Sequence, residues 1–346
     1  MSTGTTPEDR TRDSSVDGTA DGAPATPDFS AAARRQRETA TYPVPEIAKG
    51  VPVPAEGYAM EEIADGVFWL SDGSYQNMFV VTDEGVIAID APPTLGNNIL
   101  RAIARATKKP VTEVVYSHQH SDHVGAMSLY PEDVPYYAHR ATADRLVALA
   151  DPHRPRATRV FDDTVTIDAG DHSLRLDYPG PNHAEGNIFI HAPEQRVLML
   201  VDVIFPGWVP FSNLSLSANV PGFITAQEQA LEYEFDTFVG GHVNRPGTPD
   251  DVRLQIEYMT DLRATAEAAL SSVDLPTTMA PVDTTNVWAV FRAYLDAVAA
   301  QTSDEIVPRW KDRLGGADVF TLGNAWAMAE TLRLDLNSMG PFGIAP

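Results

Sequence analysis

The chain of 346 residues contains no cysteine, so it forms no disulfide bonds and holds no metal through thiolate. Any metal in the protein must therefore be bound by histidine, aspartate or glutamate. Nitrogen and oxygen ligands of this kind suit zinc, and they also accept iron and manganese.

Basic residues are also scarce. Lys and Arg together number 25 against 48 Asp and Glu, which gives a net charge of −23, and only four of the 25 are lysines. Such an acidic surface repels phosphate backbones and anionic membranes, because binding to them depends on basic contacts. We therefore expect neither a nucleic acid nor a membrane as partner, and a small molecule as substrate.

Long hydrophobic runs are missing as well. No stretch approaches the roughly 18 to 20 apolar residues of a membrane helix. The first residues lack the basic start and apolar block of a secretory signal. Residues 1–40 are instead rich in Ser, Thr, Gly, Pro and Asp, which predicts a disordered polar tail. These features together predict a cytoplasmic protein.

Residues 41–272 alternate between short β-rich runs and amphipathic helices. The runs 66–72, 77–83 and 85–91 predict an antiparallel meander, which a helix within 94–109 and a buried strand at 111–117 follow. A second strand-rich half comes next, and the pattern predicts two sheets packed face to face with helices outside. Residues 273–346 predict a helical extension that caps a pocket, forms a homodimer contact, or does both.

The stretch "YSHQHSDHVGA", residues 116–126, places three histidines and an aspartate directly after the predicted strand. Loops at strand ends can turn side chains inward on a rigid base, which is where many metal ligands lie. His118 and His120, with Asp122 and His123 just beyond them, could supply two metals from one loop.

Three more candidate ligands stand at other strand ends. His183 lies in a Gly/Pro loop, Asp202 closes an apolar strand, and His242 follows two glycines. Such polar groups are costly in a hydrophobic core unless they are paired or bind metal. One metal could take His118, His120 and His183, and a second could take Asp122, His123 and His242. Asp202 would bridge them through its two oxygens.

The H-x-H-x-D-H motif at 118–123, with the isolated His183, Asp202 and His242, resembles the metallo-β-lactamase fold superfamily over about residues 58–272. The resemblance implies an α/β fold, an αββα four-layer sandwich of two mixed β-sheets, with the site at one edge. Asp202 stands where the commonest subclass of true β-lactamases carries Cys. It resembles instead the bridging Asp of hydroxyacylglutathione hydrolases and lactonases.

With two Zn²⁺ per chain, or with Fe or Mn in their place, a metal-bridging hydroxide would attack a carbonyl carbon, and Asp122 would orient it and carry a proton. This predicts a metal-dependent hydrolase of a lactone or ester, ahead of a thioester or amide. The sequence has Phe205 where acyl-homoserine lactonases of this fold usually carry Tyr. The alternative is an iron-dependent oxidoreductase of the same fold, similar to persulfide dioxygenases.

Other residues near the motif each have two interpretations. Asp90 either orients a ligand histidine or sits in a plain turn. Phe205, Trp208 and Phe211 form either an apolar wall for substrate or ordinary loop packing. Asn244, with Arg245 beside it, is a candidate for binding a polar group of the substrate.

Overall fold

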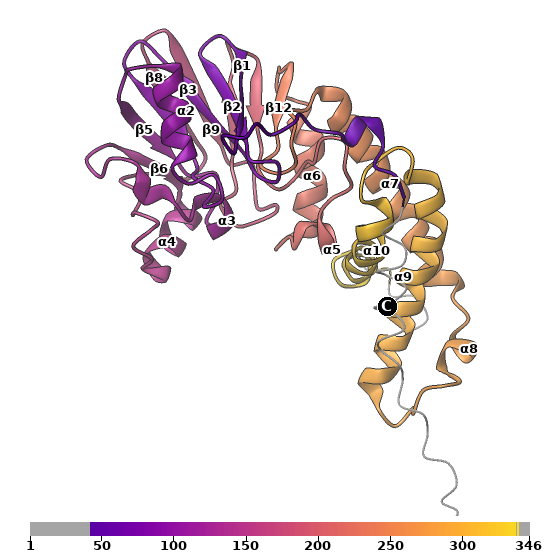
Figure 1. The fold of residues 1–346 in the computed structure, drawn as a ribbon. Helices are drawn as coiled ribbons and strands as arrows, with labels where there is room; N and C mark the ends of the chain where they lie inside the picture. The colour runs from indigo at the N-terminus through magenta and orange to yellow at the C-terminus, as the bar shows by residue number, and fades with distance from the viewer. Residues whose placement is uncertain (1–41, 337, 339–346) are drawn as a thin grey trace, which may run out of the picture. The chain divides into compact units, whose positions relative to one another are not determined.

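The computed structural model describes residues 42–336 and 338, and it contains two mixed β-sheets with helices packed on them (Figure 1). The predicted polar tail, residues 1–40, lies outside the described residues. Within the described part of the chain, no helix has the length and apolar character needed to cross a membrane.

The first sheet combines an antiparallel half with a parallel half. Strands β1 to β4 pair antiparallel, whereas β4 to β7 run parallel to one another, and all seven lie in chain order. The bounds are β1 Ala59–Ala64, β2 Val67–Ser71, β3 Gln76–Val81, β4 Val86–Ile89, β5 Val111–Val115, β6 Tyr136–His139 and β7 Arg159–Phe161.

The second sheet has the order β12-β11-β10-β9-β8. Strands β8 to β11 are antiparallel neighbours, and β12 runs parallel to β11. As a result, β9, β11 and β12 run in the same direction, and their C-terminal ends lie on the same side of this sheet. The bounds are β8 Thr164–Ala169, β9 His172–Asp177, β10 Phe189–Ala192, β11 Val197–Met199 and β12 Thr237–Val239.

Alternating side chains of β4 define two of the layers. Ile87 and Ile89 pack into the core between the sheets, and Val86 and Ala88 pack into an outer core with the helices of the first sheet. A strand that is buried on both faces reads as a continuous apolar run, which is what the sequence shows. The helices on this side are α2 Asn98–Ala106 and α4 Arg140–Leu149, with the short elements α3 Ser121–Val124 and η2 Met127–Leu129, whereas η1 Glu46–Ala48 precedes the first sheet.

The helices on the other side share a single core with the second sheet. Leu198 of β11 belongs to the same buried cluster as Leu262, Trp310 and Met328 from the helices. The helices are α5 Ser212–Ser215, α6 Val220–Ala230, α7 Pro249–Ser272, α8 Leu275–Met279, α9 Val287–Trp310 and α10 Ala317–Leu334. The core is thus continuous across residue 272, where the sequence predicts a boundary. That boundary and the homodimer contact stay predictions.

The predicted sandwich of two mixed sheets with a helical C-terminal extension is confirmed. Strand β1 was not predicted. It lies at the edge of the first sheet, and its Glu61 and Glu62 are exposed, so the hydrophobic pattern of a strand is interrupted. Charged residues at a sheet edge discourage pairing with another chain.

The sandwich core gives a stability prediction. Ile190 on β10 is fully buried between the sheets, so Ile190→Ala leaves a cavity and should lower the free energy of unfolding by about 2 to 5 kcal/mol. Val160 on β7 is 41% exposed, and Val160→Ala should change it by less than about 0.5 kcal/mol. Chemical denaturation of both variants measures the difference, and equal losses would contradict this arrangement of the core.

Candidate metal centre

The histidine-rich loop begins where β5 ends, and Asp90, at the end of the neighbouring parallel strand β4, holds it in place. The Asp90 carboxylate accepts a hydrogen bond from the backbone N–H of Ser117 (2.8 Å). The Ser117 hydroxyl in turn lies 2.9 Å from Nδ1 of His118. This contact directs the other ring nitrogen of His118, Nε2, toward the second sheet. Asp90 therefore acts on the backbone of the motif and reaches His118 through Ser117.

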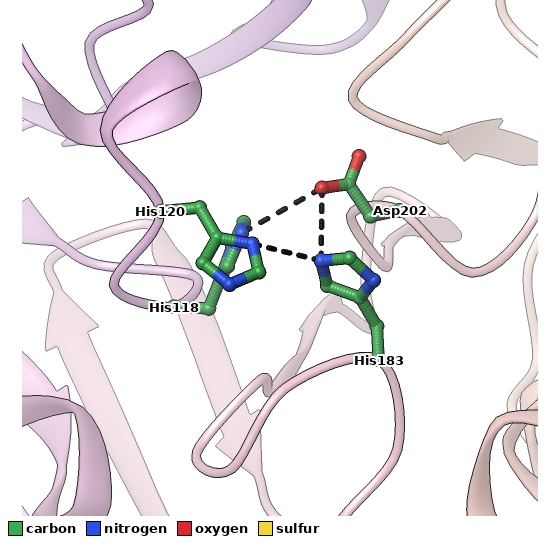
Figure 2. A group of neighbouring side chains, drawn as sticks. All are labelled: His118, His120, His183 and Asp202. Atoms are coloured by element: carbon green, nitrogen blue, oxygen red, sulfur yellow. Dashed lines mark hydrogen bonds and ion pairs between the residues drawn. The ribbon is translucent and has the colours of Figure 1, made fainter. Parts of the chain in front are cut away.

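The first group of converging side chains contains His118, His120, His183 and Asp202 (Figure 2). Nε2 of His183 lies 2.9 Å from Nδ1 of His120 and 3.2 Å from Oδ2 of Asp202. Nε2 of His118 lies 3.6 Å from the same Oδ2. One donor atom from each of the four lies within 4.8 Å of all the others.

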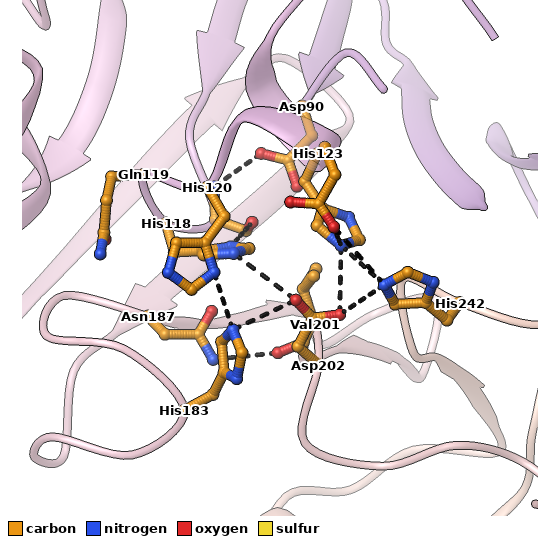
Figure 3. Close-up of polar contacts among 12 residues, drawn as sticks. Asp90, His118, Gln119, His120, His123, His183, Asn187, Val201, Asp202 and His242 are labelled. Carbon is orange, nitrogen blue, oxygen red and sulfur yellow. Dashed lines mark hydrogen bonds and ion pairs between the residues drawn. The ribbon is translucent and has the colours of Figure 1, made fainter. Parts of the chain in front are cut away.

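The second group contains Asp122, His123, His242 and again Asp202. Figure 3 labels the last three of these residues. Nε2 of His123 and Nε2 of His242 each lie 3.1 Å from Oδ1 of Asp202. Oδ2 of Asp122 lies 3.5 Å from Nε2 of His123. These donors also fall within 4.8 Å of one another. All seven predicted ligands are therefore brought together.

Asp202 belongs to both groups, and its two oxygens divide between them. Oδ2 faces His118 and His183, and Oδ1 faces His123 and His242. Asp202 lies three residues beyond the end of β11, and its backbone has a φ of +64°, a conformation that is uncommon for a residue other than glycine. Strained backbone of this kind persists where the surrounding structure enforces it, often at functional sites.

Two buried asparagines, which the sequence did not indicate, fix the His183 loop relative to Asp202. The side-chain amide of Asn187 donates to Oδ1 of Asn182 (2.8 Å) and to the carbonyl of Val201 (3.0 Å). Oδ1 of Asn182 also accepts from the backbone N–H of His183 (2.7 Å). Neither asparagine is more than 1% exposed, so these bonds are protected from water. They tie the neighbours of two ligands to each other.

The electrostatics of the cluster favour positive charge near Asp202. Burial would raise the pKa of Asp202, but His123, His183 and His242 outweigh it and hold the pKa well below its usual range. Burial would lower the pKa of His123, yet Asp202 and Asp122 raise it to about 9. Burial keeps the pKa of His118 well below its usual value. The buried carboxylates thus stabilise positive charge among the histidines.

The ligand atoms are arranged for binding a divalent metal rather than for hydrogen bonding with one another. Nε2 of His118 is buried without a hydrogen-bond partner in this structure. Buried polar atoms are rarely left so, because each costs free energy. Histidine nitrogens and carboxylate oxygens that face a common point are the ligands expected of zinc, iron or manganese.

Tyr75 is a site residue that sequence reasoning missed. Its hydroxyl lies 3.5 Å from Oδ2 of Asp122, and its ring centroid lies 4.6 Å from that of His242. The turn that carries Tyr75 pairs with the His242 loop through a Tyr75–His242 β-bridge and a hydrogen bond from Gln76 N–H to the Gly241 carbonyl (2.8 Å). These contacts join segments some 166 residues apart, so no local pattern marks the tyrosine.

The predicted substrate-binding residues border a pocket of about 660 Å³ that also contains His242. Phe205, Trp208, Phe211 and Asn244 all line it. The Asn244 amide already donates to the backbone carbonyl of Val51. Arg245, considered for the same role, lies outside this lining and pairs with Asp251.

The remaining histidines lie outside the cluster. His139, His172 and His191 are buried, and each has Nε2 within 3.0 Å of a backbone carbonyl. His153 is exposed at the surface. Their bonds to backbone explain why histidine count alone does not locate the site.

Several known proteins are similar to this chain in structure or in sequence. A metallo-β-lactamase from Pontibacter korlensis, compared by structure, gives a TM-score of 0.49 at 20% sequence identity and covers 58% of this chain and 97% of its own. In sequence, the chain is 30% identical over 202 residues to the 2,4-dinitroanisole O-demethylase subunit alpha of Nocardioides sp. (strain JS1661), which covers 55% of this chain. The match spans 60% of that relative's own length.

A second relative is covered more fully. The acyl-coenzyme A thioesterase MBLAC2 of Bos taurus is 24% identical over 253 residues, which covers 59% of this chain and 88% of the thioesterase. A family model described as the metallo-beta-lactamase superfamily matches residues 71–277, more than half of the chain. The chain therefore belongs to the metallo-beta-lactamase superfamily.

Proposed function

We propose that this chain is a binuclear metal-dependent hydrolase that cleaves a carbonyl ester bond of a small molecule, with a lactone or ester favoured over a thioester or amide. The observation that carries the proposal is the division of the Asp202 oxygens between two groups of histidines. A carboxylate that bound a single metal would not require histidine nitrogens next to both of its oxygens. The name of the thioesterase relative is consistent with acyl hydrolysis, at 24% identity.

The seven residues divide into two ligand sets in this proposal. His118, His120 and His183 would hold one metal with Oδ2 of Asp202, and Asp122, His123 and His242 would hold the other with Oδ1. Two zinc ions bound there would supply a nucleophile at neutral pH and polarise the substrate carbonyl.

Asp122 is the residue proposed to move a proton. Its side chain is 44% exposed, whereas that of Asp202 is only 5% exposed, so Asp122 is the carboxylate of the cluster that a substrate can reach. The Tyr75 hydroxyl lies 3.5 Å from Oδ2 of Asp122 and restricts the orientation of that carboxylate. Asp122 can therefore take a proton from the attacking water and deliver it to the leaving group.

The surroundings favour a small, uncharged substrate. The net charge of −23 repels anions, and the pocket beside His242 is lined mainly by apolar side chains, with Asn244 among its few polar groups. A pocket of this composition binds an apolar body and orients it through a few polar contacts.

Metal content tests the ligand assignment. We predict two divalent metals per purified chain, about one in His242→Ala, and less than one in Asp202→Ala, because Asp202 serves both groups. Inductively coupled plasma mass spectrometry measures this, with His153→Ala as a control that keeps both metals. Two metals in Asp202→Ala would refute the bridge. One iron per wild-type chain would instead favour the dioxygenase-like alternative.

Asp122→Ala tests the proton-transfer role. Removing a positioned acid–base group should lower kcat on 4-nitrophenyl acetate or γ-butyrolactone by about 10²-fold or more. Circular dichroism should be unchanged, because the side chain is only partly buried. Glu185, an exposed carboxylate two residues from His183, supplies the matched control, and Glu185→Ala should retain near wild-type turnover. Full turnover in Asp122→Ala would rule out this role.

A further inference from the structure

The pocket beside His242 is built in part from segments of the chain outside the matched residues 71–277. Val44 and Ala48 come from the segment before the first sheet, and Phe320 comes from α10. They face Trp208 and Phe211 of the loop after β11. Its volume of about 660 Å³ is that of a small-molecule site. His242 places one end of the pocket at the ligand cluster.

Helix α10 fixes the wall that it shares with this loop. Asn324 is fully buried, its amide donates to the Pro210 carbonyl (2.9 Å), and its Oδ1 accepts from the Leu214 N–H (2.8 Å). Since both groups of one side chain bind the loop backbone, a shift of α10 would break two buried hydrogen bonds.

The turn before α10 makes a second attachment. The N–H of Val209 donates to the Gly315 carbonyl (3.0 Å), and the Gly315 N–H donates to the Gly207 carbonyl (2.9 Å). A Cβ at Gly315 would lie 2.7 Å from the Trp208 ring, so only glycine permits this close packing. The aromatic wall and the C-terminal helices are therefore held as one unit.

The segment before the first sheet, residues 44–50, forms another part of the lining. The Trp208 indole N–H donates to the Ala48 carbonyl (2.9 Å), and the Val51 N–H donates to the Asn244 carbonyl (2.9 Å). Arg245 donates to the Ile47 carbonyl (2.7 Å). The arginine that sequence reasoning considered for substrate binding thus helps to build the pocket instead.

The lining is almost free of net charge. Lys49 is the one lysine or arginine among the described residues that line the pocket, and it pairs with Glu46. The rings of Phe211 and Phe320 lie 5.0 Å apart, and Phe211 is 48% exposed. This pair, in which Phe211 is exposed and Phe320 is partly buried, lies near a deeper apolar wall and suits an uncharged acyl chain or aryl ring.

We infer that the pocket holds an uncharged acyl or aryl group of the substrate, and that Phe320 on α10, with Phe211, limits the length of that group. The inference rests on the proposed function for the bond that is cleaved, but binding of the apolar group does not depend on cleavage. Through Phe320, the C-terminal helices would determine which lengths of acyl or aryl group the protein accepts.

Straight-chain hydroxamic acids of two to twelve carbons are the binding probes, because the hydroxamate chelates metal whether or not the protein is catalytically active. Isothermal titration calorimetry on the metal-loaded full chain should show affinity rising about fourfold per methylene until the pocket is full, and then levelling off. Phe320→Ala should extend the rise to longer chains, and Phe320→Trp should end it earlier. All variants should bind the two-carbon probe within about twofold of wild type.

Trp288→Ala is the matched control, because Trp288 is an aromatic residue of the same helical extension that is 81% exposed and does not line the pocket. It should leave the whole series unchanged. Wild-type affinity that does not depend on chain length would overturn the inference. So would Phe320 variants that change the two-carbon and long-chain probes equally. Because Phe320→Ala and Phe320→Trp change size in opposite directions, general destabilisation cannot mimic the expected pattern.

Hydrolysis of 4-nitrophenyl esters of matching chain lengths separates this inference from the proposed function. A length dependence in hydroxamate binding that Phe320 controls, with no ester, lactone or thioester hydrolysed, would support the pocket and reject the hydrolase. Ester hydrolysis whose preferred length is the same in wild type and in both Phe320 variants would reject the pocket and leave the hydrolase standing.

Discussion

The Asp202 carboxylate lies among four histidine rings, and this one buried group sets the requirements for the rest of the fold. An ionised carboxylate taken out of water needs positive charge or strong hydrogen bonds on all its free sides. Here the histidines surround it on both oxygens, and burial leaves no access for water to replace them. Each loop that carries one of these histidines must therefore be held at a fixed distance from the end of β11.

The two sheets meet this requirement through the direction of their strands. Parallel pairing of β4 with β5 brings Asp90 beside the motif loop, and the shared direction of β9, β11 and β12 brings the loops of His183, Asp202 and His242 to one edge. Hydrogen bonds between the sheets, such as the one from the Ile188 N–H to the Ser117 carbonyl (3.0 Å), align the two edges. Local hydrogen bonds, such as the one between the side chains of Asn187 and Asn182, then fix the position of single loops.

A site residue can be predicted from the sequence when the residues near it in the chain indicate its role. His118 to His123 stand in one short loop after an apolar strand, and His183, Asp202 and His242 each follow a strand of their own, so spacing and setting identify all seven. Tyr75 and Phe320 have no such signal. Tyr75 reaches Asp122 only because its turn pairs with a distant loop, and an aromatic residue on a helix such as α10 more often belongs to a core. Arg245 was considered for substrate binding because the sequence does not show that its guanidinium group binds Asp251 and the Ile47 carbonyl.

Each ligand group draws donors from both sheets, since the motif loop follows β5 of the first and the other three residues follow strands of the second. A cation bound there is consequently a crosslink between the two halves of the sandwich. The unfolded chain cannot offer the same site, because the donors are spread over more than one hundred residues. Metal affinity and resistance to unfolding would then be linked by mass action, so removing a bound cation would lower the free energy of unfolding.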